Sequence, residues 1–281
     1  MFIFSLFGNG LVLFIIHRFE KLTTVTNILF LNLMFSSVFC MSSLPFRAVY
    51  IQRSDWIFGE AMCKIVGSLY YLSFYSSVLF LTLLTFDRHL AVVYSTGACQ
   101  VRNQRYAVIS CAVVWLVSGL ACIRPMILHK TFKVMGNLTN CDEYHGNLGN
   151  INMPLLKQSG FYLQLILFLI FPLVVIIYCY LRIAITVMSS TIVKKFKIVR
   201  FIFFVGIFFI CWTPFNIIEL IIIKLHDESR SCEGSKKLFY ALEVTRVMAY
   251  AYFCITPIFY RFVGKKFQSY FKQLLVKCFP G

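Results

Sequence analysis

Long runs of residues without a charged side chain recur along this sequence, and they limit the folds that it can adopt. Five runs hold 18 to 25 uncharged residues each, and two further apolar stretches lie near the two ends of the chain. A helix of about 20 apolar residues crosses a bilayer and satisfies its own backbone hydrogen bonds. The runs therefore predict an all-α membrane protein with seven transmembrane helices. They are bounded by Lys21 and Arg47, Lys64 and Asp87, Arg105 and Arg124, Lys157 and Arg182, and Arg200 and Glu219; the other two are Met1–His17 and Val247–Tyr260, the latter lengthened by Leu238–Val244.

The composition agrees with a membrane protein. Of the 281 residues 59% are hydrophobic and 14% are charged, which is more apolar surface than one soluble core can bury. The runs are continuous rather than alternating, so they do not fit a β-barrel. No linker or repeat divides the chain, and we expect one domain over residues 1–281 that is not an enzyme.

The first apolar stretch is short. Its 17 residues before Arg18 rise only about 25 Å at roughly 1.5 Å per residue. We therefore expect the start of this helix and an extracellular segment before it to be missing. A signal peptide fits less well, because the stretch lacks a basic start and a small-residue cleavage site.

The basic residues predict the orientation. The loops after the first, third and fifth helices and the tail hold 15 Lys and Arg against two acids, a net +13, while the other side holds 12 against nine, a net +3. The positive-inside rule places the N-terminus outside the cell and the tail in the cytoplasm. The total of +16 thus reflects topology and contact with anionic membrane lipids, and it does not indicate nucleic-acid binding.

The predicted outer face has the features of an extracellular surface. Cys63, Cys141 and Cys232 lie there, where disulfides persist, and the odd number leaves one for a partner in the missing segment. Asn137 begins an Asn-Leu-Thr sequon in the longest outer loop, so we expect a glycan on it. No close-spaced pattern of Cys and His suggests a metal, and we expect no cofactor.

The tail after the last helix, Phe262–Phe279, has aromatic and aliphatic residues near helical spacing with lysines between them. This pattern predicts a short basic amphipathic helix on the inner leaflet. Cys278 within it is a candidate for lipid acylation.

Marker residues fall in each of the seven predicted helices. They are, in chain order, Gly8-Asn9, Leu31-Asn32-Leu33, Cys63, Asp87-Arg88-His89, Trp115, Pro172, Tyr180, Cys211-Trp212-Thr213-Pro214 and Thr256-Pro257-Ile258-Phe259-Tyr260. With these markers the chain resembles a rhodopsin-like (class A) G-protein-coupled receptor over essentially its whole length.

Four further motifs narrow the class. They are Ser43-Leu44-Pro45-Phe46, Trp56-Ile57-Phe58-Gly59, Ser231-Cys232-Glu233 and Phe262-Val263-Gly264-Lys265-Lys266-Phe267. With them the chain resembles the chemokine receptors. Among these it looks most like the branch of the receptor for lymphotactin, the C-motif chemokine, because Arg246 stands where most chemokine receptors have Glu but that branch has Arg.

The resemblance implies partners and bonds. It implies a disulfide between Cys63 and Cys141, a second one from Cys232 to an absent N-terminal cysteine, and a chemokine-like extracellular ligand. It further implies a plasma-membrane receptor that acts in chemotaxis through a heterotrimeric G protein, with arrestin as a further partner.

An activation switch is implied in the inner half of the bundle. Asp87 and Arg88, next to His89, would form an ion pair that a partner displaces, and Tyr180 and Tyr260 would supply polar groups at a similar depth. The alternative is an ordinary boundary pair that only sets the depth of the helix.

Prolines in three helices are candidate hinges. Pro172, Pro214 and Pro257 each remove a helical hydrogen bond, which makes them hinges or static kinks. Trp212, two residues before Pro214, would report on that hinge or simply pack in the core.

Charged residues in the outer thirds of the predicted helices outline a ligand pocket. A charge at that depth usually faces a cavity or the bundle interior. Arg246 and Glu219 are assigned to the pocket, whereas for Arg47 and Glu243 a side chain that reaches the surface is an equal alternative. The full predicted set is Arg47, Tyr70, Tyr71, Glu219, Glu243 and Arg246.

Three residues depart from the pattern of the family. Ser37 replaces a buried Asp, Thr256 replaces an Asn and His89 replaces a Tyr. The intramembrane sodium site of the family needs that Asp, so sodium regulation is not expected here.

Other functions compete with a signalling chemokine receptor. A binder of the same fold that captures ligand without signalling would share the outer features. A receptor for a small anionic or lipid ligand would fit the cationic Arg47 and Arg246. A transporter or membrane enzyme would need inverted repeats, broken helices or a catalytic cluster, and the sequence shows none of these.

Overall fold

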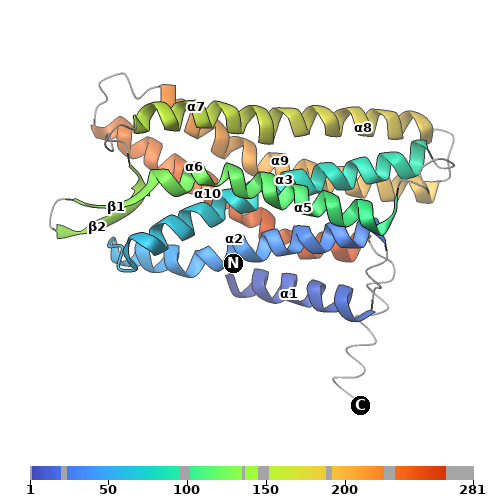
Figure 1. Cartoon of the computed structure of the whole chain (residues 1–281), viewed down its shortest axis with the longest axis horizontal. Coiled ribbons are helices and arrows are strands. Elements are labelled where there is room, and N and C mark those ends of the chain that lie inside the picture. The colour runs from blue at the N-terminus through green and yellow to red at the C-terminus, as the bar shows by residue number, and fades with distance from the viewer. Residues whose placement is uncertain are drawn as a thin grey trace, which may run out of the picture.

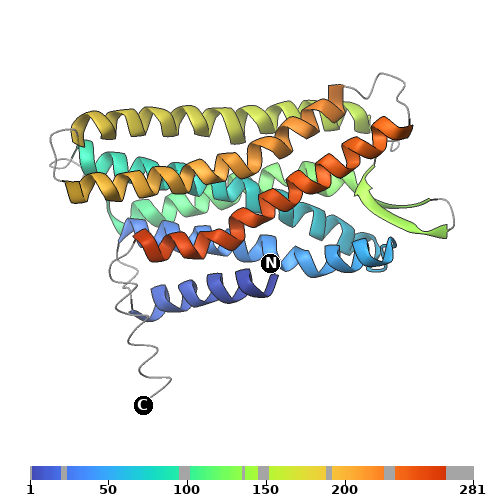
Figure 2. The same cartoon turned by 180° about the vertical axis from the view of Figure 1, so that it is seen from behind.

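The structure is a bundle of long helices with a short β-hairpin at one end (Figures 1 and 2). It is a computed structural model that describes residues 2–19, 24–94, 102–134, 137–144, 152–187, 192–224 and 232–263. Within these residues six helical stretches are long and apolar enough to cross a membrane, and Phe2–Ile15 is a shorter apolar helix. The predicted seven-helix bundle is confirmed for this part of the chain.

The helices follow the uncharged runs and extend beyond most of them. They are α1 (Phe2–Phe19), α2 (Val25–Arg53), α3 (Gly59–Val93), α5 (Gln104–Ala121) followed by α6 (Ile123–Leu128), α7 (Met153–Leu165) followed by the π-helical turn η2 (Ile166–Ile170) and α8 (Phe171–Val187), α9 (Ile192–Lys224) and α10 (Cys232–Val263).

Capping residues mark several helix starts. The side chains of Thr24, Asn103 and Asn152 each accept a hydrogen bond from a backbone N–H in the first turn of α2, α5 and α7, respectively. Gly59 begins α3 with φ at 77°, in the left-handed region that favours glycine. These three capping residues and Gly59 thus mark where the helices begin.

The hairpin consists of β1 (His129–Lys133) and β2 (Thr139–Glu143), which pair antiparallel with Thr131 opposite Cys141. The sequence predicted only a long loop here. We call the end of the bundle that carries these strands the hairpin end, and the other the opposite end (Figure 1).

Helix α3 is the axis of the bundle. It contacts α2, α5, α6, α8 and both strands. Polar side chains join its neighbours: Ser36 on α2 lies 2.7 Å from Ser76 on α3, and Trp115 on α5 donates to Asn32 on α2 at 2.8 Å. Packing and such interhelical hydrogen bonds hold helices together in lipid, where the hydrophobic effect between them is lost.

Pro257 links α10 to α1. Because proline has no N–H, the carbonyl of Phe253 four residues earlier lacks its helical donor. That oxygen accepts hydrogen bonds from Ser5 Oγ and Asn9 Nδ2 of α1, at 3.1 Å each. A Cβ added to Gly8 would lie 3.1 Å from the ring of Pro257, so the two helices approach closely.

The other two prolines also lie at irregular points. Pro172 is the second residue of α8, just after the π-helical turn η2, and α9 continues through Pro214. Helices α9 and α10 both change direction along their length (Figure 2). The helices of Pro214 and Pro257 are thus bent, whereas α7 and α8 run straight past Pro172 (Figure 1). A hinge motion at any of the three prolines stays a prediction.

Several predicted features lie outside the described residues. These are most of the amphipathic tail helix, Cys278 within it, and the side chains of Cys232 and Tyr260.

Candidate functional site

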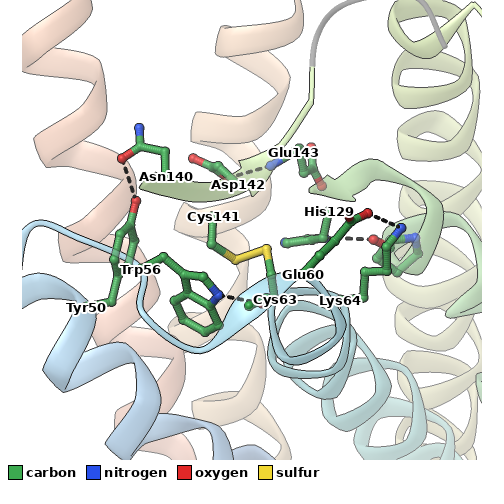
Figure 3. Close-up of a disulfide and its surroundings, with 12 residues drawn as sticks. Tyr50, Trp56, Glu60, Cys63, Lys64, His129, Asn140, Cys141, Asp142 and Glu143 are labelled. Atoms are coloured by element: carbon green, nitrogen blue, oxygen red, sulfur yellow. Dashed lines mark hydrogen bonds and ion pairs between the residues drawn. A yellow bond between two sulfur atoms is a disulfide. The ribbon is translucent and has the colours of Figure 1, made fainter. Parts of the chain in front are cut away.

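A disulfide ties the hairpin to α3. Cys63 near the start of α3 and Cys141 in β2 are joined through their sulfur atoms, which confirms the bridge implied by the resemblance (Figure 3). The bridge fixes β2 over the hairpin end of the bundle. Glu143, two residues further along β2, is thereby placed above the interior of the bundle.

Hydrogen bonds reinforce this attachment. The turn between α2 and α3 contributes Asp55, which accepts from the backbone N–H of Thr139, and Trp56, whose backbone N–H donates to the carbonyl of Thr139, both at 2.8 Å. Tyr50 of α2 donates to the side chain of Asn140 at 3.0 Å (Figure 3). The hairpin is therefore a fixed part of the bundle.

A cavity of about 150 Å³ lies beneath the hairpin. Five of the six residues predicted for the ligand pocket line it: Arg47, Tyr70, Tyr71, Glu219 and Arg246. The structure thus brings together side chains from four helices that are far apart in the sequence. The remaining lining residues are Tyr50, Trp56, Val66, Gly67, His129, Cys141, Asp142, Glu143, Lys157, Ile222, Leu242 and Tyr250.

Acidic groups gather on one side of the cavity. The hydroxyl of Tyr71 lies 3.0 Å from a carboxyl oxygen of Glu143 and 3.0 Å from one of Glu219. Lys157 at the start of the fifth pass forms an ion pair with Glu143 at 2.9 Å. Burial raises the pKa of the Glu143 carboxyl, but the positive charges of Lys157, His129 and Arg124 outweigh it and hold the pKa well below its usual range.

Basic groups gather on the other side. Glu243 of α10 accepts hydrogen bonds from both Arg47 of α2 and Arg246 of α10, the latter at 2.7 Å. The guanidinium of Arg246 also lies 5.9 Å from the ring centre of Tyr70 and 5.8 Å from that of Phe215. Glu243 is not among the lining residues, but it holds the two arginines that are.

A buried aromatic cluster forms the floor of the cavity. The ring of Trp212 on α9 is fully buried, and its centre lies 5.3 Å from that of Tyr70 and 4.4 Å from that of Phe74, both on α3. Pro214 follows Trp212 on the same helix. Trp212 therefore packs in the core, as one of its two interpretations expected. A role in reporting on the kink at Pro214 stays a prediction.

The ion pair at the opposite end differs from the expected one. Asp87 is fully buried and accepts two hydrogen bonds from Arg102, at 2.7 and 3.0 Å, and one from Thr26 at 2.8 Å. The predicted pair of Asp87 with its neighbour Arg88 is therefore replaced by a pair with Arg102. Adjacent helical residues point in different directions, and Arg102, two residues before the start of α5, reaches the carboxylate instead.

The other switch residues lie around this pair. Arg88 is half-buried, and Tyr180 packs against Phe201 of α9 with ring centres 6.3 Å apart. His89 is buried between aromatic rings, with Tyr94 and Tyr178 at 5.6 and 5.9 Å. Their roles in switching stay predictions.

The two neutral replacements of the family's sodium site are buried. Ser37 Oγ donates to the carbonyl of Leu33 at 3.1 Å, and Thr256 Oγ1 donates to that of Tyr252 at 2.9 Å. Each hydroxyl thus bonds to its own helix, so these two bonds do not link α2 to α10.

Sequence reasoning missed part of the site. Glu143 and Lys157 lie in or beside an outer loop, and Arg124 and Gln164 were passed over as helix residues. Arg124 donates to Gln164 at 2.9 Å, and its guanidinium lies 5.7 Å from the ring centre of Tyr71. The available signals were the position of Glu143 two residues after a bridged cysteine, the polar Gln164 inside an uncharged run, and Arg124 at the end of another.

Comparison with known proteins agrees with this arrangement. The model of the 7 transmembrane receptor (rhodopsin family) matches residues 8–260. C-C chemokine receptor type 1 of Homo sapiens is 36% identical over 98% of this chain and 77% of its own length. C-C chemokine receptor type 3 of Cavia porcellus is 34% identical, with 98% and 76% covered, and C-C chemokine receptor type 8 of Homo sapiens is 33% identical, with 99% and 77% covered. The chain therefore belongs to the rhodopsin family of seven-transmembrane receptors and, within it, to the chemokine receptors.

Proposed function

We propose that this G-protein-coupled receptor binds a chemokine in the cavity at the hairpin end and passes the signal to a heterotrimeric G protein at the opposite end. The observation that carries the proposal is the cavity itself, which is lined by charges of both signs and by Tyr70, whose ring packs on the buried ring of Trp212. A ligand that binds one packing of these helices better than another shifts the population of the bundle.

The hairpin end faces the outside of the cell in this proposal. The uneven distribution of Lys and Arg supports this orientation, with the tail in the cytoplasm of a plasma-membrane receptor. Asn137, close to β2, would then carry its glycan outside. Arrestin and anionic lipids would meet the basic opposite end.

The six predicted pocket residues are the proposed ligand contacts. Five line the cavity, and Glu243 holds Arg47 and Arg246 in place. Membership of the lymphotactin branch rests on Arg246 and stays a prediction.

A binding screen tests the function. Full-length receptor in cells is offered labelled C-C chemokines and the C-motif chemokine, and G-protein activation is measured alongside binding. We expect at least one chemokine to bind with high affinity and to activate. Binding without activation would indicate a capture receptor, and no binding by any chemokine would contradict the proposal. A Cys63→Ala variant, counted at the cell surface, serves as a control for a disturbed hairpin.

A further inference from the structure

Two carboxyl groups meet at a single hydroxyl group in the cavity. Oη of Tyr71 on α3 lies 3.0 Å from Oε1 of Glu143 on β2 and 3.0 Å from Oε1 of Glu219 on α9. A tyrosine hydroxyl has one hydrogen, so it donates to only one of them. Two ionised carboxylates that shared this hydrogen would repel each other across the hydroxyl group, whereas a protonated carboxyl group supplies a second hydrogen. The geometry therefore favours one of the two glutamates being a carboxylic acid.

The surrounding charges decide which one. Lys157 Nζ lies 2.9 Å from Oε2 of Glu143, so Glu143 stays ionised. Arg124 on α6 also lies near this cluster, but it donates to the side chain of Gln164 and to the backbone carbonyl of Lys157 instead. Oε2 of Glu219 is buried and has no hydrogen-bond partner among the described residues. A buried carboxylate oxygen without a partner is costly, whereas an acid that donates from Oε1 to Tyr71 leaves only an uncharged carbonyl oxygen at Oε2, which costs less.

The other charged groups that line the cavity also have partners. Arg47 on α2 and Arg246 on α10 both donate to Glu243, Asp142 accepts from the backbone N–H of Glu143, and the Nδ1 of His129 on β1 lies 2.8 Å from the carbonyl of Pro125. None of these bonds reaches Glu219. The positive charge that neutralises Glu219 must therefore come from a proton or from a bound molecule.

We propose that Glu219 carries a proton in the resting bundle and, with Tyr71 and Glu143, forms a subsite for a cationic group of the ligand. An entering ammonium or guanidinium group donates a hydrogen bond to Oε2 of Glu219, and the proton leaves the carboxyl group for solvent. One positive charge replaces another, so the net charge of the subsite is unchanged. This inference rests on the proposed function, because it assumes that the ligand enters this cavity.

The subsite gives the ligand a direction. A cation of the ligand lies toward α9 and Glu219, while acceptor groups lie toward the arginines of α2 and α10. The shared chemistry is a cation that donates hydrogen bonds, and it can come from the α-amine of the ligand or from a Lys or Arg side chain near it.

An infrared experiment tests the subsite without any chemokine. Purified full-length receptor is titrated with n-butylammonium chloride, and tetramethylammonium chloride, a cation without an N–H donor, serves as the control probe. We expect a carbonyl band of a protonated carboxyl group that n-butylammonium removes and tetramethylammonium does not. The Glu219→Gln variant should lack this band, and Glu60→Gln, which changes a carboxylate outside the cavity, should keep it. If Glu219→Gln removes no band, or if n-butylammonium leaves the band unchanged, the subsite does not exist.

A second experiment identifies the source of the cation. A chemokine that binds the receptor is prepared in its native form, with its N-terminal amine acetylated, and with the Lys and Arg of its N-terminal segment replaced by Gln. Glu219→Gln should weaken binding of the native form about tenfold and leave the affinity of one neutralised form unchanged. That form names the group that enters the subsite. Equal losses for all three forms would overturn the proposal, whereas a failure of every chemokine to bind would contradict the proposed function and leave the infrared result to decide the subsite.

Discussion

The ring of Tyr70 on α3 lies 5.3 Å, centre to centre, from the ring of Trp212 on α9. Tyr70 lines the cavity, while Trp212 is fully buried beneath it and precedes Pro214 by two residues. A ligand that moves Tyr70 therefore acts directly on the helix segment next to a proline kink. This contact connects the cavity directly to the bundle core.

Removing the ring of Tyr70 should separate binding from signalling. We expect Tyr70→Leu to lower the potency of G-protein activation about tenfold while changing chemokine affinity less, because an aromatic contact contributes about 0.5–1.5 kcal/mol. The control variant Tyr70→Phe keeps the ring and loses only the hydroxyl group. The buried hydroxyl of Tyr70 has no hydrogen-bond partner among the described residues, so this variant should behave like the wild type. Equal potency in Tyr70→Leu and Tyr70→Phe would show that the contact does not transmit the signal.

Breaking the disulfide should release the hairpin. Cys63→Ala removes a cross-link across 78 residues, and loss of a native disulfide typically costs about 2–5 kcal/mol. We expect chemokine binding to be abolished and the number of receptors at the cell surface to fall. Cell-surface antibody staining with ligand binding on the same cells measures both, and the Cys141→Ala variant should match. Normal binding in either variant would refute a functional role of the bridge.

The pair of Asp87 and Arg102 should stabilise the opposite end. Arg102→Gln leaves the buried carboxylate of Asp87 with Thr26 as its other observed donor, and removing one partner of a buried pair can cost about 3–5 kcal/mol. Because Arg102 is partly exposed, we expect a loss nearer the lower limit. Thermal unfolding of purified receptor measures it. Asp87→Asn in the same chain removes the unpaired charge and should recover part of the loss; if the double variant is less stable than Arg102→Gln alone, the charge pair is not the cause.

Sodium should not regulate this receptor. The hydroxyls of Ser37 and Thr256 bond to carbonyls of their own helices, and neither offers the negative charge that compensates a buried cation. Agonist affinity should be the same with sodium chloride as with choline chloride. The double variant Ser37→Asp, Thr256→Asn should gain a sodium dependence. A sodium effect in the wild type would refute this prediction.

The sequence predicted the helices better than the contacts between them. Uncharged runs define helices because lipid excludes charge, and the runs indicated all seven passes. The hairpin was missed because its strands, His129–Lys133 and Thr139–Glu143, are short and polar. Their pairing depends on the tether to α3, which the sequence implied only through the resemblance.

The site was predicted in part for a similar reason. Arg246 and Glu219 were found because a charge in an apolar run is conspicuous. Glu143 lies in a loop where charges are common, and only the folded chain places it at the hydroxyl of Tyr71. The partner of Asp87 was wrong because Arg102 lies outside the helix of Asp87, 15 residues further along the chain, and helical periodicity does not place such a residue.

The affinity of a chemokine for the Arg246→Gln variant tests the central claim most directly. Arg246 lines the cavity with a side chain that is 15% exposed, and Glu243 keeps Arg47 as a partner when Arg246 is neutral. Arg53→Gln, an exposed arginine at the end of α2 that does not line the cavity, is the matched control. We expect Arg246→Gln to weaken binding at least about tenfold, or about 1.4 kcal/mol, with normal surface expression, and Arg53→Gln to leave binding unchanged. Wild-type affinity of Arg246→Gln for every chemokine that the receptor binds would contradict the assignment of the cavity as the ligand site.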